Sequence, residues 1–297
     1  MKNNNFKIDF IGIGVMKAAS SWIFKNLKKH PEICSSSTKE THFFNKDYNY
    51  DRGIEFYKIF FKECPKDKLK GEFTPSYMFY KKSAKRIYKH FPKVKLFCCL
   101  RNPIEKAKSN YYFAVQNKSK FYHLYDSFDE AVYNDKILIE KGFYYKQLKR
   151  YFDLFPEENI LVLFYNDLKE TPEEFIQKIY SFLEVDKNFI PSSINKKKNI
   201  TGEKYVTSKF PWINFLIYKT QSIVGRDSLV DNLLEKSRIK KYIRKFIYDN
   251  QKIERKEIPK NLKKEMKPKT RKFLQKVYKE DIEKLEKLIN KDLSHWK

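Results

Sequence analysis

The stretch from Asp9 to Trp22, DFIGIGVMKAASSW, constrains the fold of this chain more than any other. Residues 10–13 form a short apolar run rich in strand formers, whereas apolar residues recur at helical spacing from Trp22 to Leu27. The stretch therefore predicts a strand, a glycine-containing turn and a helix. At such a junction the unpaired amides of the helix start, small side chains and Lys17 can together bind phosphate or sulfate. The alternative is an α/β junction that binds nothing.

This loop differs from the phosphate-binding loop of kinases. The pattern G-x-x-x-x-G-K-[ST] needs a glycine before the lysine and Ser or Thr after it, but Met16 precedes and Ala18 follows Lys17. A kinase that uses a magnesium nucleoside triphosphate is therefore disfavoured. Ser20 and Ser21 offer hydroxyl donors or a helix cap.

Further apolar runs predict a parallel α/β fold. We expect strands at residues 10–13, 31–34, 68–73, 94–100 and 159–164, and helices at 54–61, 82–90, 104–116, 128–140, 144–155, 172–183 and 271–289. Strands that alternate with helices specify a doubly wound parallel sheet, whose ligand lies beyond the carboxyl ends of the strands. Four charged residues come just after predicted strands: Lys17, Glu40, Glu72 and Arg101. We expect them to share one site.

No internal repeat or linker divides the chain, so we expect a single domain over residues 1–297. Its core covers about residues 6–200, and a helical, basic C-terminal region of about 201–297 packs on that core. The basic amphipathic segment 204–269 is interpreted as a solvated helical face, with a membrane-surface or acceptor-binding face as the alternative.

The net charge of the chain indicates which classes of partner it can bind. The chain has 63 Lys and Arg against 37 Asp and Glu, a net charge of +26. This favours an anionic partner, such as a nucleotide, a sulfated or carboxylated glycan, nucleic acid or an acidic membrane surface. No apolar run is long enough to span a bilayer or to serve as a signal-peptide core, so we expect a cytoplasmic protein.

The four cysteines, Cys34, Cys64, Cys98 and Cys99, form neither a C-x-x-C pair nor a zinc-finger spacing. We expect reduced thiols in the core, without disulfides. The sequence has no cluster of metal-ligating residues, so no metal is expected.

Three further motifs accompany the first stretch: KETHFF at residues 39–44, LRNPIEKAKSNY at 100–111, and DIEKLEKL at 281–288 followed by DLSHW at 292–296. Together the four segments resemble the PAPS-dependent sulfotransferase family, most closely its bacterial members and its heparan-sulfate branch. The likeness runs from about Ile8 to Trp296. It departs at Ala19, where the family usually has glycine, and at Asn45, where the glycan branch often has Asp.

The resemblance implies a P-loop-like sulfotransferase fold. It also implies transfer of a sulfuryl group from 3′-phosphoadenosine 5′-phosphosulfate (PAPS) to a hydroxyl or amine of an acceptor, with adenosine 3′,5′-bisphosphate as the product. The KETHFF motif favours a carbohydrate acceptor, with a lipid headgroup, a small metabolite or a peptide tyrosine as alternatives. No metal or nucleic acid is implied.

The resemblance also assigns residues to these roles. The 5′-phosphosulfate loop comprises Lys17, Ala18, Ala19, Ser20, Ser21 and Trp22. In it, Lys17 donates to the departing bridging oxygen. The 3′-phosphate is bound by Arg101 and Ser109, and Glu40 is the base that takes the acceptor proton.

Further residues complete the predicted site. His42 assists Glu40, while Lys39, His42 and Glu72 lie on the acceptor side. Lys197 and Lys198 in the run 196–198 are further cofactor-binding candidates, with a plain solvated turn as the alternative.

Two other functions compete with a sulfotransferase. A nucleotide kinase would need a Gly-Lys-Ser loop and a magnesium-binding Asp after a buried strand, and the sequence contains neither. A non-catalytic basic protein that binds nucleic acid or an anionic surface predicts aromatic residues interleaved with Lys and Arg on an exposed face. Most aromatic residues here follow core periodicity instead.

Overall fold

A computed structural model describes residues 6–116, 125, 127–195, 205–208, 251–254 and 265–297. The chain falls into two compact units. The first contains residues 1–110, 135–199 and 267–297, and the second contains 111–134 and 200–266. The single domain expected from the sequence stays a prediction.

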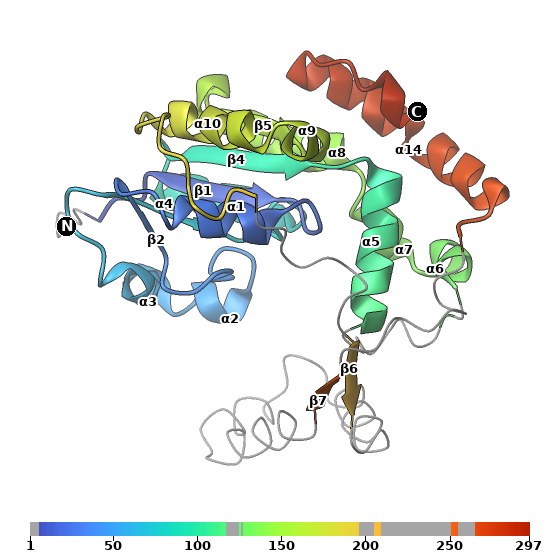
Figure 1. Cartoon of the computed structure of the whole chain (residues 1–297), viewed down its shortest axis with the longest axis horizontal. Coiled ribbons are helices and arrows are strands. Elements are labelled where there is room, and N and C mark those ends of the chain that lie inside the picture. The colour runs from blue at the N-terminus through green and yellow to red at the C-terminus, as the bar shows by residue number, and fades with distance from the viewer. Residues whose placement is uncertain (1–5, 117–124, 126, 196–204, 209–250, 255–264) are drawn as a thin grey trace. The chain divides into compact units, whose positions relative to one another are not determined.

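A five-stranded sheet forms the centre of the first unit (Figure 1). Its strands follow the order β2 (Ile33–Ser35), β3 (Leu69–Phe73), β1 (Phe10–Gly14), β4 (Lys95–Leu100) and β5 (Ile160–Phe164). All neighbouring strands are parallel. The central strand β1 is buried along its whole length, as a sheet covered on both faces requires. The predicted strands and their parallel arrangement are confirmed.

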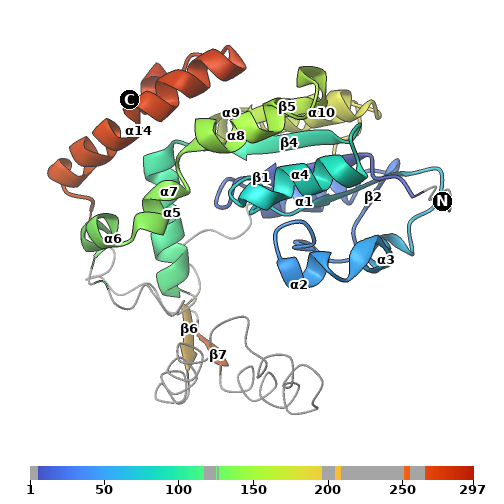
Figure 2. The same cartoon turned by 180° about the vertical axis from the view of Figure 1, so that it is seen from behind.

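Helices cover both faces of this sheet (Figures 1 and 2). On one face α1 (Ser20–Leu27) and α10 (Pro172–Leu183) meet, with the Trp22 and Phe175 rings 6.0 Å apart. On the other face α4 (Lys81–His90) lies beside α8 (Tyr144–Phe152), and the Tyr88 ring lies 5.3 Å from that of Phe155. The doubly wound fold is therefore confirmed.

Shorter elements join these layers. They are α2 (Asp47–Tyr50), α3 (Gly53–Lys58), η1 (Ile59–Phe61), α7 (Lys136–Glu140), η3 (Glu157–Asn159) and α9 (Tyr165–Glu170). The structure divides the predicted helix 128–140 into α6 (Phe128–Asn134) and α7. The Asp135 carboxylate accepts hydrogen bonds from the amides of Ile137 and Leu138, so it caps a new helix instead of continuing the old one.

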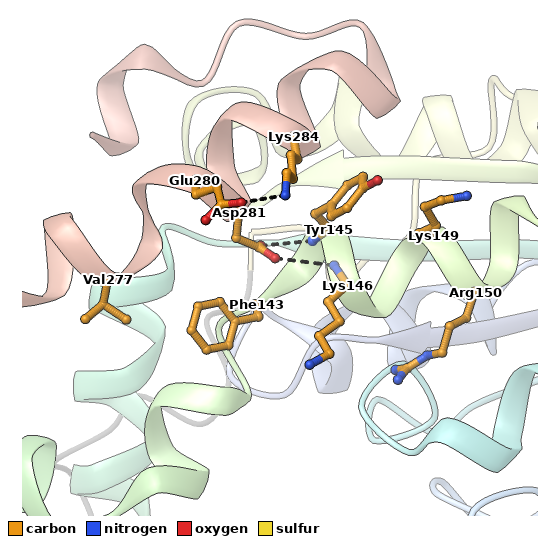
Figure 3. Close-up of a pocket in the computed structure, with 9 residues that line it drawn as sticks. All are labelled: Phe143, Tyr145, Lys146, Lys149, Arg150, Val277, Glu280, Asp281 and Lys284. Atoms are coloured by element: carbon orange, nitrogen blue, oxygen red, sulfur yellow. Dashed lines mark hydrogen bonds and ion pairs between the residues drawn. The ribbon is translucent and has the colours of Figure 1, made fainter.

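The C-terminal helix α14 (Pro268–Ile289) packs on α8. The Asp281 carboxylate accepts hydrogen bonds from the amides of Tyr145 (3.0 Å) and Lys146 (3.3 Å) at the start of α8 (Figure 3). After α14 comes η4 (Ser294–Trp296), whose Trp296 is buried beside Tyr144. A hollow of about 570 Å³ lies between α8 and α14. None of the described site candidates lines it.

The second unit contains the end of α5 (Pro103–Gln116), which begins after β4, together with α6. It also contains an antiparallel ribbon of β6 (Tyr205–Ser208) and β7 (Gln251–Glu254). The sequence did not predict this ribbon. Most of the basic segment 204–269 lies outside the described residues.

The expectation of four reduced cysteines is wrong. Cys34 at β2 and Cys64 after η1 form a disulfide with 5.6 Å between their Cα atoms, whereas Cys98 and Cys99 are free and buried in β4. The bonded cysteines are 30 residues apart in sequence. Their pairing depends on the fold and not on local spacing, so a search for short cysteine motifs misses it.

Two features are absent from the described residues. Within these ranges no helix is both long and apolar enough to cross a membrane. Over the same ranges no group of three or more His, Cys, Asp or Glu side chains is arranged to hold a metal ion.

Candidate active site

The loop between β1 and α1 is shaped by two residues in the left-handed backbone region. Lys17 has φ 68° and Ala19 has φ 63°. A residue with a Cβ costs about 1–2 kcal/mol in this region, which explains why glycine suits position 19. Helix α1 begins at Ser20, and its cap residue Ala19 provides no side-chain hydrogen bond. The serines therefore do not cap the helix, and its first amides suit an external acceptor.

Arg101 lies beside this loop. Its Nη1 donates to the carbonyl oxygen of Lys17 at 3.1 Å. The Arg101 backbone is held in turn, because the Tyr144 hydroxyl donates to its carbonyl oxygen at 2.7 Å. The guanidinium lies 4.8 Å from the centroid of the Tyr165 ring. The structure thus brings together the residues predicted to bind the two ends of one ligand.

Burial and, to a smaller extent, the positive charge of Arg101 together lower the pKa of the Lys17 ammonium to about 8. Two cations held side by side repel each other, and an anion bound between them relieves that repulsion. A perturbed lysine in this position is typical of a functional site.

The remaining cofactor-binding candidates lie around α1 and α5. Ala18 is buried, Ser20 is largely buried and Ser21 is half-buried. The Trp22 indole donates to the carbonyl oxygen of Ile194 at 3.1 Å, which ties residues just before the 196–198 run to the first turn of α1. Ser109 lies on α5 and is largely buried. Lys197 and Lys198 lie outside the described residues.

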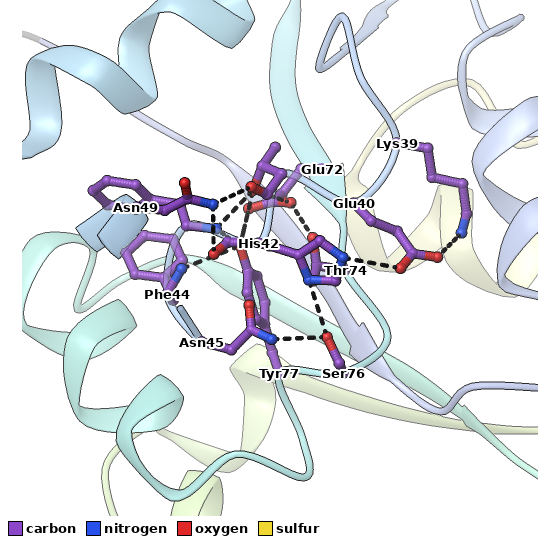
Figure 4. Close-up of polar contacts among 12 residues, drawn as sticks. Lys39, Glu40, His42, Phe44, Asn45, Asn49, Glu72, Thr74, Ser76 and Tyr77 are labelled. Carbon is purple, nitrogen blue, oxygen red and sulfur yellow. Dashed lines mark hydrogen bonds and ion pairs between the residues drawn. The ribbon is translucent and has the colours of Figure 1, made fainter. Parts of the chain in front are cut away.

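A second group of charged residues lies on the loop after β2 (Figure 4). The Lys39 ammonium is 2.6 Å from Oε1 of Glu40, and Nε2 of His42 is 3.5 Å from Oε2 of the same carboxylate. All three side chains are half-buried. The Glu40 carboxylate is therefore partly accessible to solvent and has a histidine and a lysine as neighbours.

The backbone of this loop is left-handed at Glu40 and His42. Glu40 has φ 66° and His42 has φ 53°. Such left-handed conformations persist only where the surroundings hold them. The Asn49 amide donates to the carbonyl oxygens of Thr41 (3.3 Å) and His42 (3.2 Å).

Side chains from the β3–α4 segment also contact the loop. Nδ1 of His42 lies 3.4 Å from the Ser76 hydroxyl, and the Asn45 amide donates to the same hydroxyl at 3.1 Å. Asn45 lies at the position where the family pattern differs. Its side chain thus helps to hold Ser76, whose hydroxyl lies beside His42.

Glu72 was expected on the acceptor side and just after a strand, but it lies within β3 and its side chain is fully buried. Four hydroxyls donate to its carboxylate. Burial raises the pKa of this carboxyl, and the hydroxyls oppose that shift. A side chain enclosed in this way does not contact an acceptor.

The two groups of charged residues lie at one edge of the sheet because all strands are parallel. The segment after β3 contacts both sides. Its Thr74 and Met78 amides donate to the carbonyl oxygens of Gly12 (3.0 Å) and Ile13 (2.9 Å) in β1. The Ser76 hydroxyl of the same segment contacts His42.

Sequence reasoning missed the residues that support this site. They are Thr41, Asn49, Tyr57, Thr74, Tyr77 and Tyr144. Such residues are frequent in any chain, and their spacing carries no motif. Only the fold shows that their polar atoms converge.

The site consists of a helix start without a side-chain cap, two adjacent cations and a separate carboxylate, all on the carboxyl edge of a parallel α/β sheet. A known protein family matches this chain. The sulfotransferase domain family matches residues 7–216, more than half of the chain. The chain belongs to the sulfotransferase domain family.

Curated relatives are similar over part of the chain. The membrane-associated sulfotransferase kil1 of Dictyostelium discoideum is 34% identical over 137 residues, which cover 44% of this chain and 29% of that protein. The human heparan sulfate glucosamine 3-O-sulfotransferase 5 is 27% identical over 179 residues, 58% of this chain and 51% of that protein. The chain thus spans about half or less of the length of these relatives.

A solved structure is similar over nearly the whole chain. The sulfotransferase from Alicyclobacillus acidocaldarius has a TM-score of 0.67 at 22% identity, covering 98% of this chain and 99% of that one. The likeness confirms the fold class expected from the sequence.

Proposed function

We propose that this protein is an enzyme that transfers a sulfuryl group from PAPS to a hydroxyl or amine of an acceptor. The observation that carries this proposal is the 3.1 Å hydrogen bond from Arg101 to the Lys17 carbonyl oxygen. It places the Arg101 guanidinium beside the loop that carries Lys17 and leads into α1, an arrangement that suits a ligand with phosphate groups at two positions.

Lys17 and the first amides of α1 bind the 5′-phosphosulfate, and Arg101 with Ser109 binds the 3′-phosphate. As the bond between sulfur and the bridging oxygen breaks, Lys17 donates a hydrogen bond to that oxygen and stabilises its growing negative charge. Adenosine 3′,5′-bisphosphate leaves with this electron pair.

Glu40 takes the proton from the acceptor hydroxyl or amine as the new bond to sulfur forms. The Lys39 ammonium and His42 contact its carboxylate and hold it in place. Displacement needs the acceptor atom, the sulfur and the bridging oxygen in line, so catalysis depends on where Glu40 lies relative to Lys17.

A carbohydrate is the acceptor class that the comparisons support best. Heparan sulfate glucosamine 3-O-sulfotransferases are among the relatives, and the positive charge of this chain suits an anionic glycan.

Ligand-dependent thermal stabilisation tests this function. We expect adenosine 3′,5′-bisphosphate to raise the melting temperature at moderate salt, whereas ATP and DNA have smaller effects. Arg101→Ala removes the 3′-phosphate contact and should weaken bisphosphate binding by about tenfold or more. The matched control Arg271→Ala removes an exposed arginine that pairs with Glu105 and should leave binding unchanged.

Stabilisation by DNA, with no effect of the bisphosphate, would instead identify a basic nucleic-acid-binding protein. Stabilisation by ATP and magnesium alone would favour a kinase.

A further inference from the structure

The buried carboxylate of Glu72 is hydrogen-bonded to Thr41, which lies next to the proposed base Glu40 in the sequence. Glu72 lies in β3 with no exposed surface. Its Oε1 accepts from the hydroxyls of Tyr57 (2.9 Å) and Tyr77 (2.8 Å). Its Oε2 accepts from those of Thr41 (2.8 Å) and Thr74 (2.7 Å) (Figure 4). These four donors satisfy the carboxylate without a cation.

The carboxylate determines which way these hydroxyls point. A hydroxyl has one proton, so a hydroxyl that donates to Glu72 presents only lone pairs to its other neighbours. The phenolic oxygen of Tyr77 accordingly accepts from the backbone amides of Phe43 (3.1 Å) and Phe44 (3.4 Å). The Thr41 hydroxyl oxygen lies 3.4 Å from the Phe43 amide and 2.9 Å from the Tyr77 oxygen.

These contacts reach the strained part of the loop. Thr41 separates Glu40 from His42, both of which adopt left-handed backbone conformations, and Phe43 follows directly. The Phe43 and Phe44 rings are themselves fully buried, so the loop is fixed to the core immediately after His42.

We infer that Glu72 is a positioning residue, which orients the Tyr77 and Thr41 hydroxyls so that they hold the Glu40–His42 loop in its strained conformation. This role rests on the proposed function, in which Glu40 is the base. Glu72 itself touches neither donor nor acceptor.

Glu72→Gln tests the inference with almost no change of volume. The amide introduces N–H donors where hydroxyls now donate, so at least one hydroxyl must reverse and compete for the Tyr77 oxygen. We expect hydrogen exchange of the Phe43 and Phe44 amides to accelerate by about fivefold or more, as the loss of one net hydrogen bond implies. Turnover of PAPS with a heparan sulfate oligosaccharide should fall by about tenfold or more, because the base is displaced. Affinity for adenosine 3′,5′-bisphosphate should stay within about twofold.

Asp281→Asn is the matched control. Asp281 is also a largely buried carboxylate in the same unit, but it accepts from amides at the start of α8. This variant should lose stability without faster exchange at Phe43 and Phe44 and without loss of turnover. If these amides exchange no faster in Glu72→Gln than in Asp281→Asn, the positioning role is overturned.

Tyr77→Phe provides a second route if Glu72→Gln does not fold. It keeps the buried ring and removes only the oxygen that accepts from Phe43 and Phe44, so the same faster exchange is expected. Unchanged exchange in this variant would also overturn the inference.

The exchange measurement separates this inference from the proposed function. A wild-type protein that binds no bisphosphate and transfers no sulfuryl group would refute the enzyme, while the exchange rates would still decide whether Glu72 holds the loop.

Discussion

At the residue scale, the charged residues of the candidate site could be predicted from the sequence. The side chains and backbone conformations around them could not. Lys17 and Arg101 were found because they follow apolar runs that read as strands, and the structure joins them by a hydrogen bond. Glu72 was also found, but its acceptor-side placement was wrong because alternating apolar and polar letters do not show that four hydroxyls enclose a carboxylate. The left-handed conformations of Glu40 and His42 were equally hidden, since neither is a glycine.

The lowered pKa of Lys17 predicts how ligand binding depends on pH. With a pKa of about 8 in place of the ordinary 10.5, the free protein carries a charged Lys17 below pH 8 and loses that charge above it. A phosphate binds the charged form more tightly, so affinity for adenosine 3′,5′-bisphosphate should fall as pH rises above 8. Calorimetric titration between pH 6.5 and pH 9.5 measures this.

Lys17→Ala is the control for that pH dependence. It should bind about tenfold or more weakly at pH 7, with a much flatter profile. A wild-type affinity that stays constant across the alkaline range would contradict the assignment of Lys17 to the phosphate.

At the element scale, the apolar pattern placed each strand of the five-stranded sheet and most helices of the first unit to within a few residues, because buried segments leave a strong signal in the sequence. The pattern did not predict features that depend on one polar contact or one covalent bond. Asp135 begins a new helix through its own carboxylate, and the Cys34–Cys64 bond joins β2 to the turn after η1. Disulfides are most frequent in oxidising compartments, and the cytoplasmic location expected from the sequence stays a prediction.

The disulfide predicts the response of the protein to reductant. Closing a loop of 30 residues restricts the unfolded chain and stabilises the fold by about 3–4 kcal/mol in the entropic treatment. We expect the Cys34→Ser, Cys64→Ser double variant to melt several degrees lower than the oxidised protein. Reductant should lower the melting temperature of the wild type but not that of the variant.

Thiol counting provides an independent check. The denatured, unreduced wild type should show two free thiols, those of Cys98 and Cys99. Four reactive thiols would contradict the bond.

At the scale of the whole molecule, the parallel sheet and its ligand edge followed from the order of strands and helices alone, whereas the two compact units did not. The reason is that strand order is set locally by each crossover, but membership of a unit depends on contacts between distant segments. The clearest case is residues 267–297, which belong to the unit that begins at the N-terminus.

The packing of the C-terminal segment against the first unit predicts the effect of removing Trp296. Trp296 is almost fully buried, with its ring 6.1 Å from that of Tyr144 and 5.9 Å from that of Phe164. The Tyr144 hydroxyl in turn donates to the Arg101 carbonyl oxygen, so Trp296 packs against a residue that holds the Arg101 backbone. Trp296→Ala should cost about 3–5 kcal/mol of unfolding free energy, measured by denaturant titration. It should weaken bisphosphate binding only modestly while the protein stays folded.

His295→Ala is the matched control, because the neighbouring side chain is exposed and its loss should change stability by less than about 0.5 kcal/mol. If Trp296→Ala unfolds as the wild type does, the C-terminal segment does not stabilise the sheet. In that case Tyr144 would have to hold Arg101 without support from Trp296.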